Sequence, residues 1–491
     1  MRDGGARRRS DPHAGNGGTT SPPGAGGRAG HRARTLYRLE VTADEASAFL
    51  HAHQAPTVRV GLLGCGNVGG ALAEILLTRS EDVAARTGIR LELVGIAVAH
   101  PERPRPVAIP ADLIGADAAA LVARDDVDVV VEVIGGLHPA HELIEAALRT
   151  GKPVVTANKA LLAVAGAELA EVAASAGVDL LSEAAVAGAI PVIRPLRESL
   201  AGEQIVRVMG IVNGTTNYIL TRMEEEGASY EDVLRDAQEL GMAERDPTAD
   251  VEGHDAAAKA AILAALAFGS DVVDADVHRE GISAISAADV AYASRLGYSV
   301  KLLAIAELID GGPEISVRVH PTMVPKTHPL ASVRGAFNAV FVEGAVSGEL
   351  MLYGRGAGGG PTASAMLGDL VDASRNLLAG APAPAPKRTS TTVFAQNDLR
   401  SAFYLSMDVA DRPGVLAAVA KIFGDHDVSI RAMEQVGLAA EARLIFLTHV
   451  AREGDLLATI DELRRHQAVD RVSGVLRVIA GRADDATGDL S

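Results

Sequence analysis

The chain has 491 residues, which is too long for one ordinary domain and predicts two to four. Its 46 basic and 63 acidic side chains give a formal net charge of −17, which argues against nucleic acid or an anionic membrane as a partner. The single cysteine, Cys65, excludes an intrachain disulfide and a multi-cysteine zinc site, and we expect a cytoplasmic protein without a transmembrane span.

Residues 1–34 are rich in glycine, proline and serine and contain seven arginines. They lack the apolar core that a secretory signal needs. This composition predicts a disordered extension. A nucleic-acid-binding arm is the alternative interpretation, because arginines can bind phosphates.

The next part of the chain alternates strands and helices. Val58–Arg79 predicts an apolar strand, a glycine turn and a helix, and Ile89–Ala99 predicts a second strand. Asp126–Gly136 is rich in β-branched residues, as in a strand that is buried on both faces. A helix at His141–Arg149 and a short strand at Lys152–Asn158 follow. This alternation predicts a parallel, doubly wound sheet.

The glycine turn has the pattern Gly64-x-Gly66-x-x-Gly69, directly after the first strand and at the start of a helix. Gly64 permits a tight turn, Gly66 lets the backbone approach a pyrophosphate, and Gly69 allows close packing of helix and strand. The diphosphate of a dinucleotide would then lie at the helix N-terminus. A tight turn without a ligand is the alternative.

Two features of the sequence bear on the cofactor preference. No acid directly follows the second strand to bind a ribose 2′-hydroxyl, although Glu102 is a late substitute. Arg103 or Arg105 would instead meet a 2′-phosphate, so NADP is favoured over NAD, but both arginines are also compatible with simple surface charge. We interpret Cys65 as a small packing residue within the loop.

After Pro191 the pattern becomes that of a mixed α/β domain. Residues 205–227 predict a strand, a turn and a helix, while 254–269 and 289–308 are both expected to be helical. Three stretches alternate apolar and polar side chains, as half-buried strands do, and their sheet offers a surface for a subunit interface. They are residues 315–324, 337–346 and 349–356.

The stretch ERDPTADVEGHDAAAK, residues 244–259, gathers acids in an otherwise apolar region. Asp255 and Lys259 are four residues apart and share one helix face. Asp255 is therefore either a capping residue with Lys259 as its ion-pair partner, or part of a binding site. The spacing of the acids does not match a calcium-binding loop.

Extended to LGMAERDPTADVEGHDAAAKAAIL, this stretch resembles the signature segment of homoserine dehydrogenases. Other segments agree with that family in order and spacing, and together they cover roughly residues 57–380. These are the glycine loop, TANKALL at 156–162, EAAVAGAIPVI at 183–193, GIVNGTTNYIL at 210–220 and GRGAGGGPTASA at 354–365.

The resemblance implies reversible oxidation of L-homoserine to L-aspartate 4-semialdehyde, with NADP or NAD, in threonine, methionine and isoleucine biosynthesis. Lys259 matches the family's acid/base lysine, and burial can lower a lysine's pKa towards neutrality. Lys159 matches a second active-site lysine between cofactor and substrate, which can polarise the carbonyl oxygen. Glu244 and Asp255 match residues that hold the substrate's amino group and hydroxyl region, with Asp250 in support.

The stretch EAAVAGAI resembles the family's monovalent-cation loop. The resemblance implies that Glu183 and the backbone carbonyls of Val186, Gly188 and Ile190 coordinate Na⁺ or K⁺. Small residues in the loop let carbonyls point inward at a hard cation. The alternative is an ordinary crossover turn with Glu183 in solvent.

The resemblance also implies a cofactor site. Gly241 matches a glycine beside the nicotinamide, and Gly356 or Gly358 returns to the cofactor from the second domain. Two departures from the family are Ala189, where a third glycine is common, and residues 99–103, which replace an arginine-containing turn and leave cofactor preference open. The implied cofactor-binding residues are Gly64, Cys65, Gly66, Asn67, Val68, Gly69, Lys159, Gly241 and Gly358.

An Ala/Pro-rich linker, residues 378–390, precedes a β-α-β-β-α-β rhythm in which Met407–Gln435 resembles an ACT domain. The resemblance implies threonine as a feedback inhibitor, with its carboxylate at a helix N-terminus. Gly414 supplies left-handed backbone freedom, and Asp411 and Asp427 are candidate polar contacts. A dimerisation module without a ligand is the alternative.

The whole chain is therefore expected to be α/β, with a Rossmann-type domain, a mixed α/β catalytic and dimerisation domain and a ferredoxin-like ACT domain, in a homodimer or homotetramer. The predicted boundaries are 1–56 for the N-terminal extension, 57–190 for the NAD(P)-binding domain, 191–380 for the catalytic domain, 381–398 for the linker and 399–491 for the ACT domain.

Two other functions fit the same architecture. One is a different nicotinamide enzyme, although a semialdehyde dehydrogenase that forms a thioester would need a cysteine outside the glycine loop, and the chain has none. The other is a non-catalytic sensor of nucleotides and amino acids. The presence of both Lys159 and Lys259 argues against a sensor, because sensing requires neither lysine.

Overall fold

The computed structural model describes residues 55–105, 107–382, 391–438 and 441–479. The predicted disordered extension at 1–34 and the linker residues 383–390 lie outside the described residues. Within the described ranges, no helix is long and apolar enough to cross a membrane.

The first sheet has six parallel strands in the order β3-β2-β1-β4-β5-β6, which confirms the predicted doubly wound sheet. The chain winds outward from β1 on one side and from β4 on the other, so ligands are expected beyond the carboxyl ends of these two strands. The strands are β1 Thr57–Leu63, β2 Arg90–Ala97, β3 Ile114–Gly115, β4 Val129–Glu132, β5 Val154–Thr156 and β6 Leu180–Leu181.

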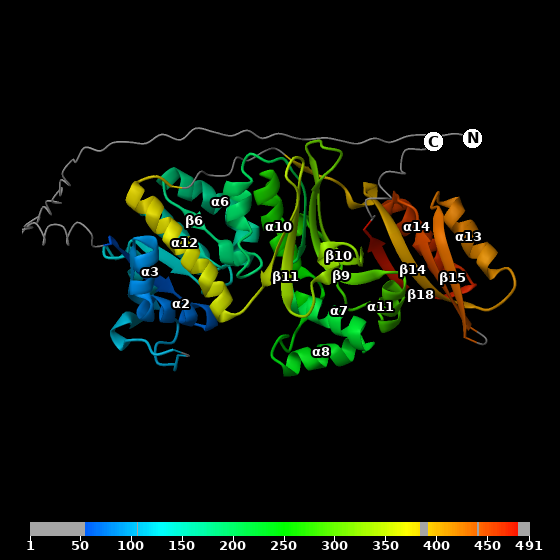
Figure 1. Ribbon diagram of the computed structural model, residues 1–491, viewed down its shortest axis with the longest axis horizontal. Helices are drawn as coiled ribbons and strands as arrows, with labels where there is room; N and C mark the ends of the chain where they lie inside the picture. The colour runs from blue at the N-terminus through cyan, green and yellow to red at the C-terminus, as the bar shows by residue number, and fades with distance from the viewer. Residues whose placement is uncertain (1–54, 106, 383–390, 439–440, 480–491) are drawn as a thin grey trace, which may run out of the picture. The chain divides into compact units, whose positions relative to one another are not determined.

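In the described ranges, five α-helices connect these strands, and a sixth α-helix joins them from far along the chain. Ala363, Met366 and Leu370 on the distant helix α12 are buried in the same apolar cluster as Val60 and Leu72. Figure 1 shows α12, in yellow, alongside the blue α2. The helices are α2 Asn67–Thr78, α3 Ser80–Thr87, α4 Ala118–Ala123, α5 Ala140–Arg149, α6 Lys159–Ala176 and α12 Gly359–Ala379.

The second sheet begins with the antiparallel order β12-β11-β7-β9-β10. Helices α7, α10 and α11 pack on it through Ile219, Leu263 and Val290, which share an apolar cluster with Val208 and Val300. The strands are β7 Ile205–Ile211, β8 His278–Arg279, β9 Tyr298–Leu308, β10 Glu314–Pro325, β11 Phe337–Gly344, β12 Gly348–Arg355 and β13 Thr392–Val393. The helices are α7 Gly214–Glu226, α8 Tyr230–Glu239, α9 Thr248–Val251, α10 His254–Phe268 and α11 Ala287–Arg295.

The prediction of one helix over residues 289–308 was wrong. Helix α11 ends at Arg295, Gly297 follows with φ +87°, and Tyr298–Leu308 is strand β9. Eight of the eleven residues of β9 are buried, because both faces of the strand are covered. A continuous apolar run of this kind looks the same in a buried strand and in a buried helix, and only pairing with β7 and β10 decides between them.

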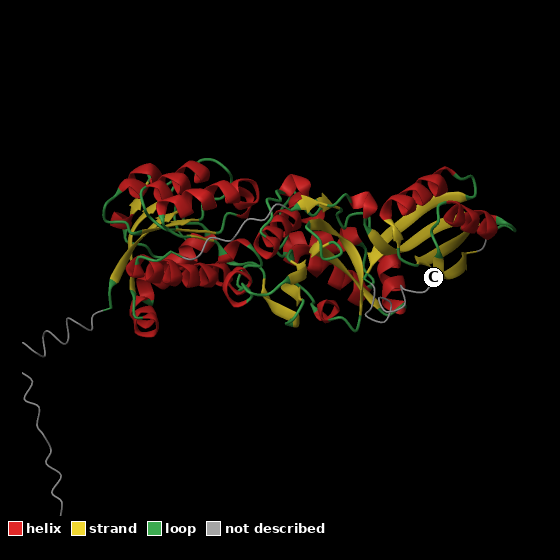
Figure 2. Ribbon diagram, turned by 90° about the horizontal axis from the view of Figure 1, so that it is seen from above, coloured by secondary structure: helices red, strands yellow, loops and turns green. Residues whose placement is uncertain are grey.

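The C-terminal domain has the predicted β-α-β-β-α-β order and the strand order β18-β14-β16-β15. Its last strand also pairs in parallel with β10, Thr322 opposite Arg477, so it continues the second sheet. Figure 2 shows helices, in red, packed on these strands, in yellow. The elements are β14 Arg400–Ala410, α13 Val415–Asp425, β15 Ile430–Leu438, β16 Glu441–Thr448, β17 Ala451–Arg452, α14 Glu453–Arg465 and β18 Val469–Val478.

Candidate active site

The glycine loop joins β1 to α2. Gly64 has φ +100°, and a Cβ atom there would lie 2.7 Å from the carbonyl oxygen of Val133. A Cβ at Gly69 would lie 2.4 Å from the Gly64 carbonyl oxygen, whereas one at Gly66 would meet no described residue within 4 Å. Gly66 is the N-cap of α2 and has no side chain, so it leaves the first N–H groups of the helix without a side-chain cap. The loop therefore fits a dinucleotide diphosphate.

Arg105 lies close to this loop. Burial raises the pKa of the Cys65 thiol, and the nearby charge of Arg105 partly offsets that rise. Arg105 Nη2 donates to the His100 carbonyl, while its Nε is buried and has no hydrogen-bond partner among the described residues. A cation with a spare donor thus stands beside the dinucleotide loop, whereas Glu102 is exposed and lies 3.4 Å from the His100 ring.

Three charged side chains meet at the amino ends of α6 and α10. Lys159 Nζ lies 2.8 Å from Asp255 Oδ1, and Lys259 Nζ donates to Asp255 Oδ2 at 2.7 Å. Lys259 also donates to the Val212 carbonyl at 2.7 Å. The Lys259 and Asp255 side chains are each 10% exposed, whereas that of Lys159 is 45% exposed. Asp255 therefore bridges Lys159, which follows strand β5 of the first sheet, and Lys259, whose helix α10 packs on the second sheet.

Electrostatic interactions among these side chains set the protonation states of Asp255 and Lys159. Burial acts to raise the pKa of Asp255, but the positive charges of Lys259 and Lys159 hold it well below its usual range. Burial acts to lower the pKa of Lys159, but Asp255, with smaller effects from Asp250 and Glu244, raises it overall. Asp255 is therefore a carboxylate and Lys159 an ammonium at neutral pH.

Asn213 completes the cluster, although its role cannot be recognised from the sequence alone. Its Nδ2 donates to Asp250 Oδ1 at 2.7 Å and to Asp255 Oδ2 at 2.9 Å. Its Oδ1 accepts from Thr216 N at 2.9 Å and caps α7. Because the cap uses the amide oxygen, the amide nitrogen points at the two carboxylates. The position of Asn213 between a strand and a helix is typical of an N-cap, and this was the feature of the sequence that could have identified it as a cap.

The other residues of the acidic stretch occupy different positions. Glu244 is exposed, and its charge acts on Lys159 without a direct contact to the cluster. Asp246 accepts from the Thr248 amide at 3.1 Å and from its hydroxyl at 2.6 Å, so it shapes the turn before α9. Gly241, with φ +70°, follows α8.

The side chain of Glu183, in the predicted cation loop, binds backbone N–H groups of the same segment. Its carboxylate accepts the backbone N–H groups of residues 192, 193 and 194 at 2.6, 2.8 and 2.8 Å, and the residue is only 4% exposed. The alternative with Glu183 in solvent is therefore wrong. Within the described ranges, the carbonyls of Val186, Gly188 and Ile190 accept no backbone hydrogen bond, so main-chain oxygens are what the loop offers a cation.

The glycine-rich loop after β12 connects these parts. A Cβ at Gly188 would lie 2.4 Å from the Gly356 carbonyl oxygen, and a Cβ at Gly359 would lie 2.7 Å from the Asn67 carbonyl oxygen. Gly358, with φ +118°, caps α12 next to that contact. The loop thus packs against both the cation loop and the start of α2.

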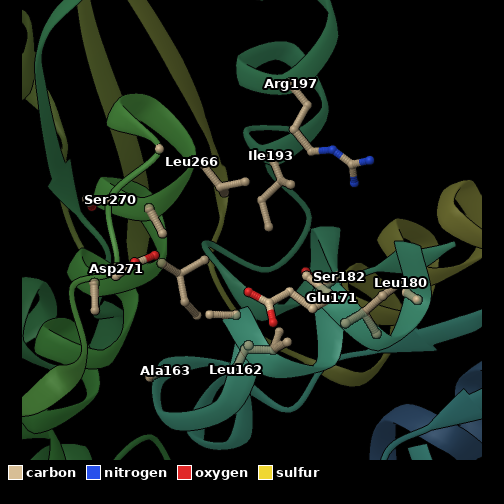
Figure 3. Close-up of a pocket in the computed structure, with 18 of the residues that line it drawn as sticks. Leu162, Ala163, Glu171, Leu180, Ser182, Ile193, Arg197, Leu266, Ser270 and Asp271 are labelled. Atoms are coloured by element: carbon tan, nitrogen blue, oxygen red, sulfur yellow. The ribbon is translucent and has the colours of Figure 1, made fainter. Parts of the chain in front are cut away.

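A cavity of about 560 Å³ lies between α6 and the C-terminal half of α10 (Figure 3). Apolar side chains such as Leu162 and Leu266 line it, with Arg197 among the few charged ones. Neither Lys159 nor Lys259 is among the lining residues. We place the chemistry at the lysine–carboxylate cluster instead, because proton transfer needs titratable groups within hydrogen-bonding reach of the reacting atoms.

A second pocket, of about 250 Å³, lies in the C-terminal domain around residues 409–416, Gln435 and Leu444. Gly414, with φ +93°, caps α13 without a side-chain partner, and Asp411 accepts from Gln435 Nε2 at 3.3 Å. Asp427 follows the opposite end of α13 and does not line this pocket.

Comparison with known proteins agrees with these features. Residues 64–183 match the homoserine dehydrogenase NAD-binding domain, residues 191–371 match homoserine dehydrogenase, and residues 403–467 match the ACT domain. The homoserine dehydrogenase of Corynebacterium glutamicum is 51% identical over 425 residues, which are 86% of this chain and 95% of that protein. The chain belongs to the homoserine dehydrogenase family. It is accordingly an oxidoreductase, with a pyridine nucleotide as its cofactor.

Further members of the homoserine dehydrogenase family resemble the chain in sequence and structure. The Mycobacterium tuberculosis H37Rv enzyme is 51% identical over 431 residues, covering 86% of this chain and 97% of that protein. The crystal structure of the Thiobacillus denitrificans enzyme has a TM-score of 0.80 at 41% identity, covering 86% of this chain and 98% of that one. A hyperthermophilic archaeal homoserine dehydrogenase in complex with NADPH has a TM-score of 0.53 at 28% identity, covering 65% and 98%.

Proposed function

We propose that the enzyme interconverts L-homoserine and L-aspartate 4-semialdehyde, as a step in threonine, methionine and isoleucine biosynthesis. The observation that carries this proposal is the position of Asp255 between Lys159 and Lys259. The substrate has an ammonium group, which carboxylates bind well, and a hydroxyl group whose oxidation releases a proton. Asp255, with Asp250 and Glu244 nearby, supplies the carboxylates, and Lys259 supplies the group that exchanges the proton.

The direction of proton movement follows from the charges. In the reducing direction, Lys259 Nζ donates its proton to the aldehyde oxygen as a hydride reaches the carbon. In the oxidising direction, the hydroxyl proton returns to Lys259 Nζ. The Lys159 ammonium stabilises negative charge on the same oxygen. A pyridine nucleotide whose diphosphate is held by the glycine loop would supply or accept the hydride.

We propose NADP as the preferred cofactor, and Arg105 as the residue that binds its 2′-phosphate. The support is the Arg105 charge beside Cys65 and the buried Nε without a partner among the described residues. We expect Arg105→Gln to raise the KM for NADP⁺ by about 10-fold or more, the usual cost of losing a charge-assisted hydrogen bond. The KM for NAD⁺, which has no 2′-phosphate, should change by less than about twofold.

Arg103→Gln is the matched control, since Arg103 is an exposed arginine two residues earlier. It should leave both KM values near those of the wild type. Equal losses for NADP⁺ and NAD⁺ in Arg105→Gln would contradict a 2′-phosphate role. An effect confined to Arg103→Gln would transfer that role to Arg103.

We propose that the 183–190 loop binds Na⁺ or K⁺ through main-chain oxygens. The left-handed conformations of Ala187 and Gly188, with φ of +56° and +59°, turn successive carbonyls in different directions, and those of Val186, Gly188 and Ile190 lack backbone partners among the described residues. Oxygen ligands suit hard cations. The Glu183 carboxylate holds the loop in shape by capping the amides of residues 192–194.

We propose threonine as the ligand of the ACT pocket and as an inhibitor of the reaction. The uncapped N-terminus of α13 offers N–H groups to an amino-acid carboxylate. Asp411 at the pocket wall offers a carboxylate to the ammonium group. We also propose that β12 faces a second copy of the chain in a dimer, because it is a sheet-edge strand that exposes Leu350, Met351 and Tyr353.

One assay tests the proposed function. It measures homoserine-dependent reduction of NADP⁺ and NAD⁺ by the full-length protein, with and without threonine, in buffers containing either K⁺ or Na⁺ or neither. We expect turnover, inhibition by threonine and loss of activity without a monovalent cation. No turnover would overturn the proposed function. Turnover that ignores threonine would overturn the regulatory proposal alone, and turnover that ignores the cation would overturn the cation site.

A further inference from the structure

One arginine side chain on the last strand of the ACT domain contacts the catalytic domain. Arg477 on β18 is 6% exposed, and its Nε and Nη2 donate to the Glu453 carboxylate at 2.9 and 2.8 Å. Its Nη1 donates across the domain boundary to Glu280 Oε1 at 2.9 Å. The bidentate pair with Glu453 fixes the guanidinium plane, so the direction in which Nη1 points to Glu280 is also fixed.

Glu280 begins a segment that lies against the acidic stretch. Its own N–H donates to the Val319 carbonyl on β10 at 2.8 Å, and Ile282 N donates to the Val251 carbonyl at 2.8 Å. A Cβ at Gly281 would lie 2.5 Å from that same Val251 oxygen, so the two backbones are in close contact. Residues 280–282 are therefore held between β10 and the turn that precedes α10.

That turn separates the two carboxylates that Asn213 binds. Asp250 lies on α9, Asp255 lies in the first turn of α10, and Gly253 joins the two helices with φ +80°. A Cβ at Gly253 would lie 3.5 Å from the Glu280 carbonyl oxygen. Since Gly253 is the joint between the helices, movement of residues 280–282 would change the position of Asp250 relative to Asp255.

We propose that Glu280, held in place by Arg477, is a positioning residue for the substrate-binding carboxylates. The connection runs from Arg477 to Glu280, through the backbone of residues 280–282, and on to Asp250 and Asp255. It rests on the proposed function, because it assigns a purpose to the carboxylates that bind the substrate.

The same connection joins the active site to the ACT pocket. Strand β14 pairs with β18, with Tyr404 opposite Leu476, and its carboxyl end at Val409 lines the pocket. The middle of β14 also contacts the catalytic domain, because Ser406 Oγ donates to Asp289 on α11 at 2.7 Å. A ligand that shifts β14 would therefore act on the catalytic domain by two routes. One is the pairing of β14 with β18, and the other is the direct contact of β14 with α11.

A purely structural role for the ion pair would give a different result. The Glu453–Arg477 pair is buried, so its loss would destabilise the ACT domain itself. The Glu280 side chain is 40% exposed, so its loss should cost little stability. Replacing Glu280 therefore tests its effect on substrate binding without a large change in the stability of the fold.

The test is Glu280→Gln in the full-length chain, assayed without an amino-acid effector. The amide keeps the side-chain shape but weakens the contacts that Glu280 Oε1 makes with Arg477 Nη1 and with His278 Nε2, each at 2.9 Å. We expect the KM and the calorimetric Kd for homoserine to rise by about 2- to 30-fold, the range found for residues that couple two sites. The KM for NADP⁺ and the midpoint of thermal unfolding should stay close to those of the wild type.

Glu434→Gln is the matched control, because Glu434 on β15 pairs with Arg295 on α11 across the same domain boundary but outside residues 280–282. It should leave the Kd for homoserine unchanged. An unchanged Kd in Glu280→Gln or an equal rise in Glu434→Gln would each overturn the positioning role. Wild-type protein that binds homoserine without turnover would contradict only the proposed function.

Discussion

Lys259→Ala is expected to lower kcat for homoserine oxidation by about 100-fold or more, the usual contribution of a general acid or base. Lys259 is the buried lysine of the cluster, fixed by Asp255 and by the Val212 carbonyl, and alanine leaves no group there to exchange the proton. Binding of NADPH, measured by fluorescence titration, should persist because the glycine loop is unaltered. Steady-state kinetics with both substrates measures the loss.

Lys259→Arg is the control for charge. Arginine keeps a positive group beside Asp255, but it does not release its proton at any ordinary pH. We therefore expect this variant to stay as inactive as Lys259→Ala. Recovery to within about threefold of the wild type would show that Lys259 acts through its charge, and proton transfer would have to be reassigned to Lys159.

The parts of the fold that the sequence predicts correctly depend on local patterns. Val58–Arg79 combines an apolar run, a glycine turn and a helical period, and all three are formed by neighbouring residues. The stretch 289–308 contains no such information beyond Gly297, because the strand at Tyr298–Leu308 is buried on both faces and does not alternate apolar with polar side chains along its length. Its conformation depends on pairing with β7 and β10, which lie far away in the sequence.

The same distinction applies to the site. Asp255 and Lys259 are recognisable as a pair because helical spacing places them on one face. The third member, Lys159, joins them only because α6 and α10 pack together, which no local pattern encodes. The role of Asn213 and the capping of residues 192–194 by Glu183 also depend on contacts between segments that are separated in sequence.

The cluster explains why one carboxylate is shared by two lysines. Asp255 Oδ1 faces Lys159 and Oδ2 faces Lys259 and Asn213, so a single side chain orients both groups that the proposed mechanism assigns to the substrate hydroxyl. Neutralising it should therefore disturb both substrate binding and catalysis.

Asp255→Asn is expected to lower kcat/KM for homoserine by about 30-fold or more, because losing one partner of a buried, hydrogen-bonded charge pair costs about 2–5 kcal/mol. The amide keeps the shape of the side chain but removes the charge that binds both lysines and that we propose binds the substrate ammonium. Asp246→Asn is the matched control, since Asp246 is exposed and accepts hydrogen bonds from the Thr248 amide and hydroxyl, and it should change kcat/KM by less than about twofold.

The pH dependence of stability provides a second measurement on the same pair of variants. The pKa of Asp255 is lowered in the folded state by Lys259 and Lys159, so the folded protein holds this proton less tightly than the unfolded chain does. The stability from this ionisation is complete above the ordinary aspartate pKa of about 3.9 and is lost as the pH falls below it. The thermal-midpoint difference between wild type and Asp255→Asn should therefore be large at pH 7 and shrink below about pH 4. A difference that is constant with pH, together with a kcat/KM within about threefold of the wild type, would mean that Asp250 or Glu244 binds the substrate instead.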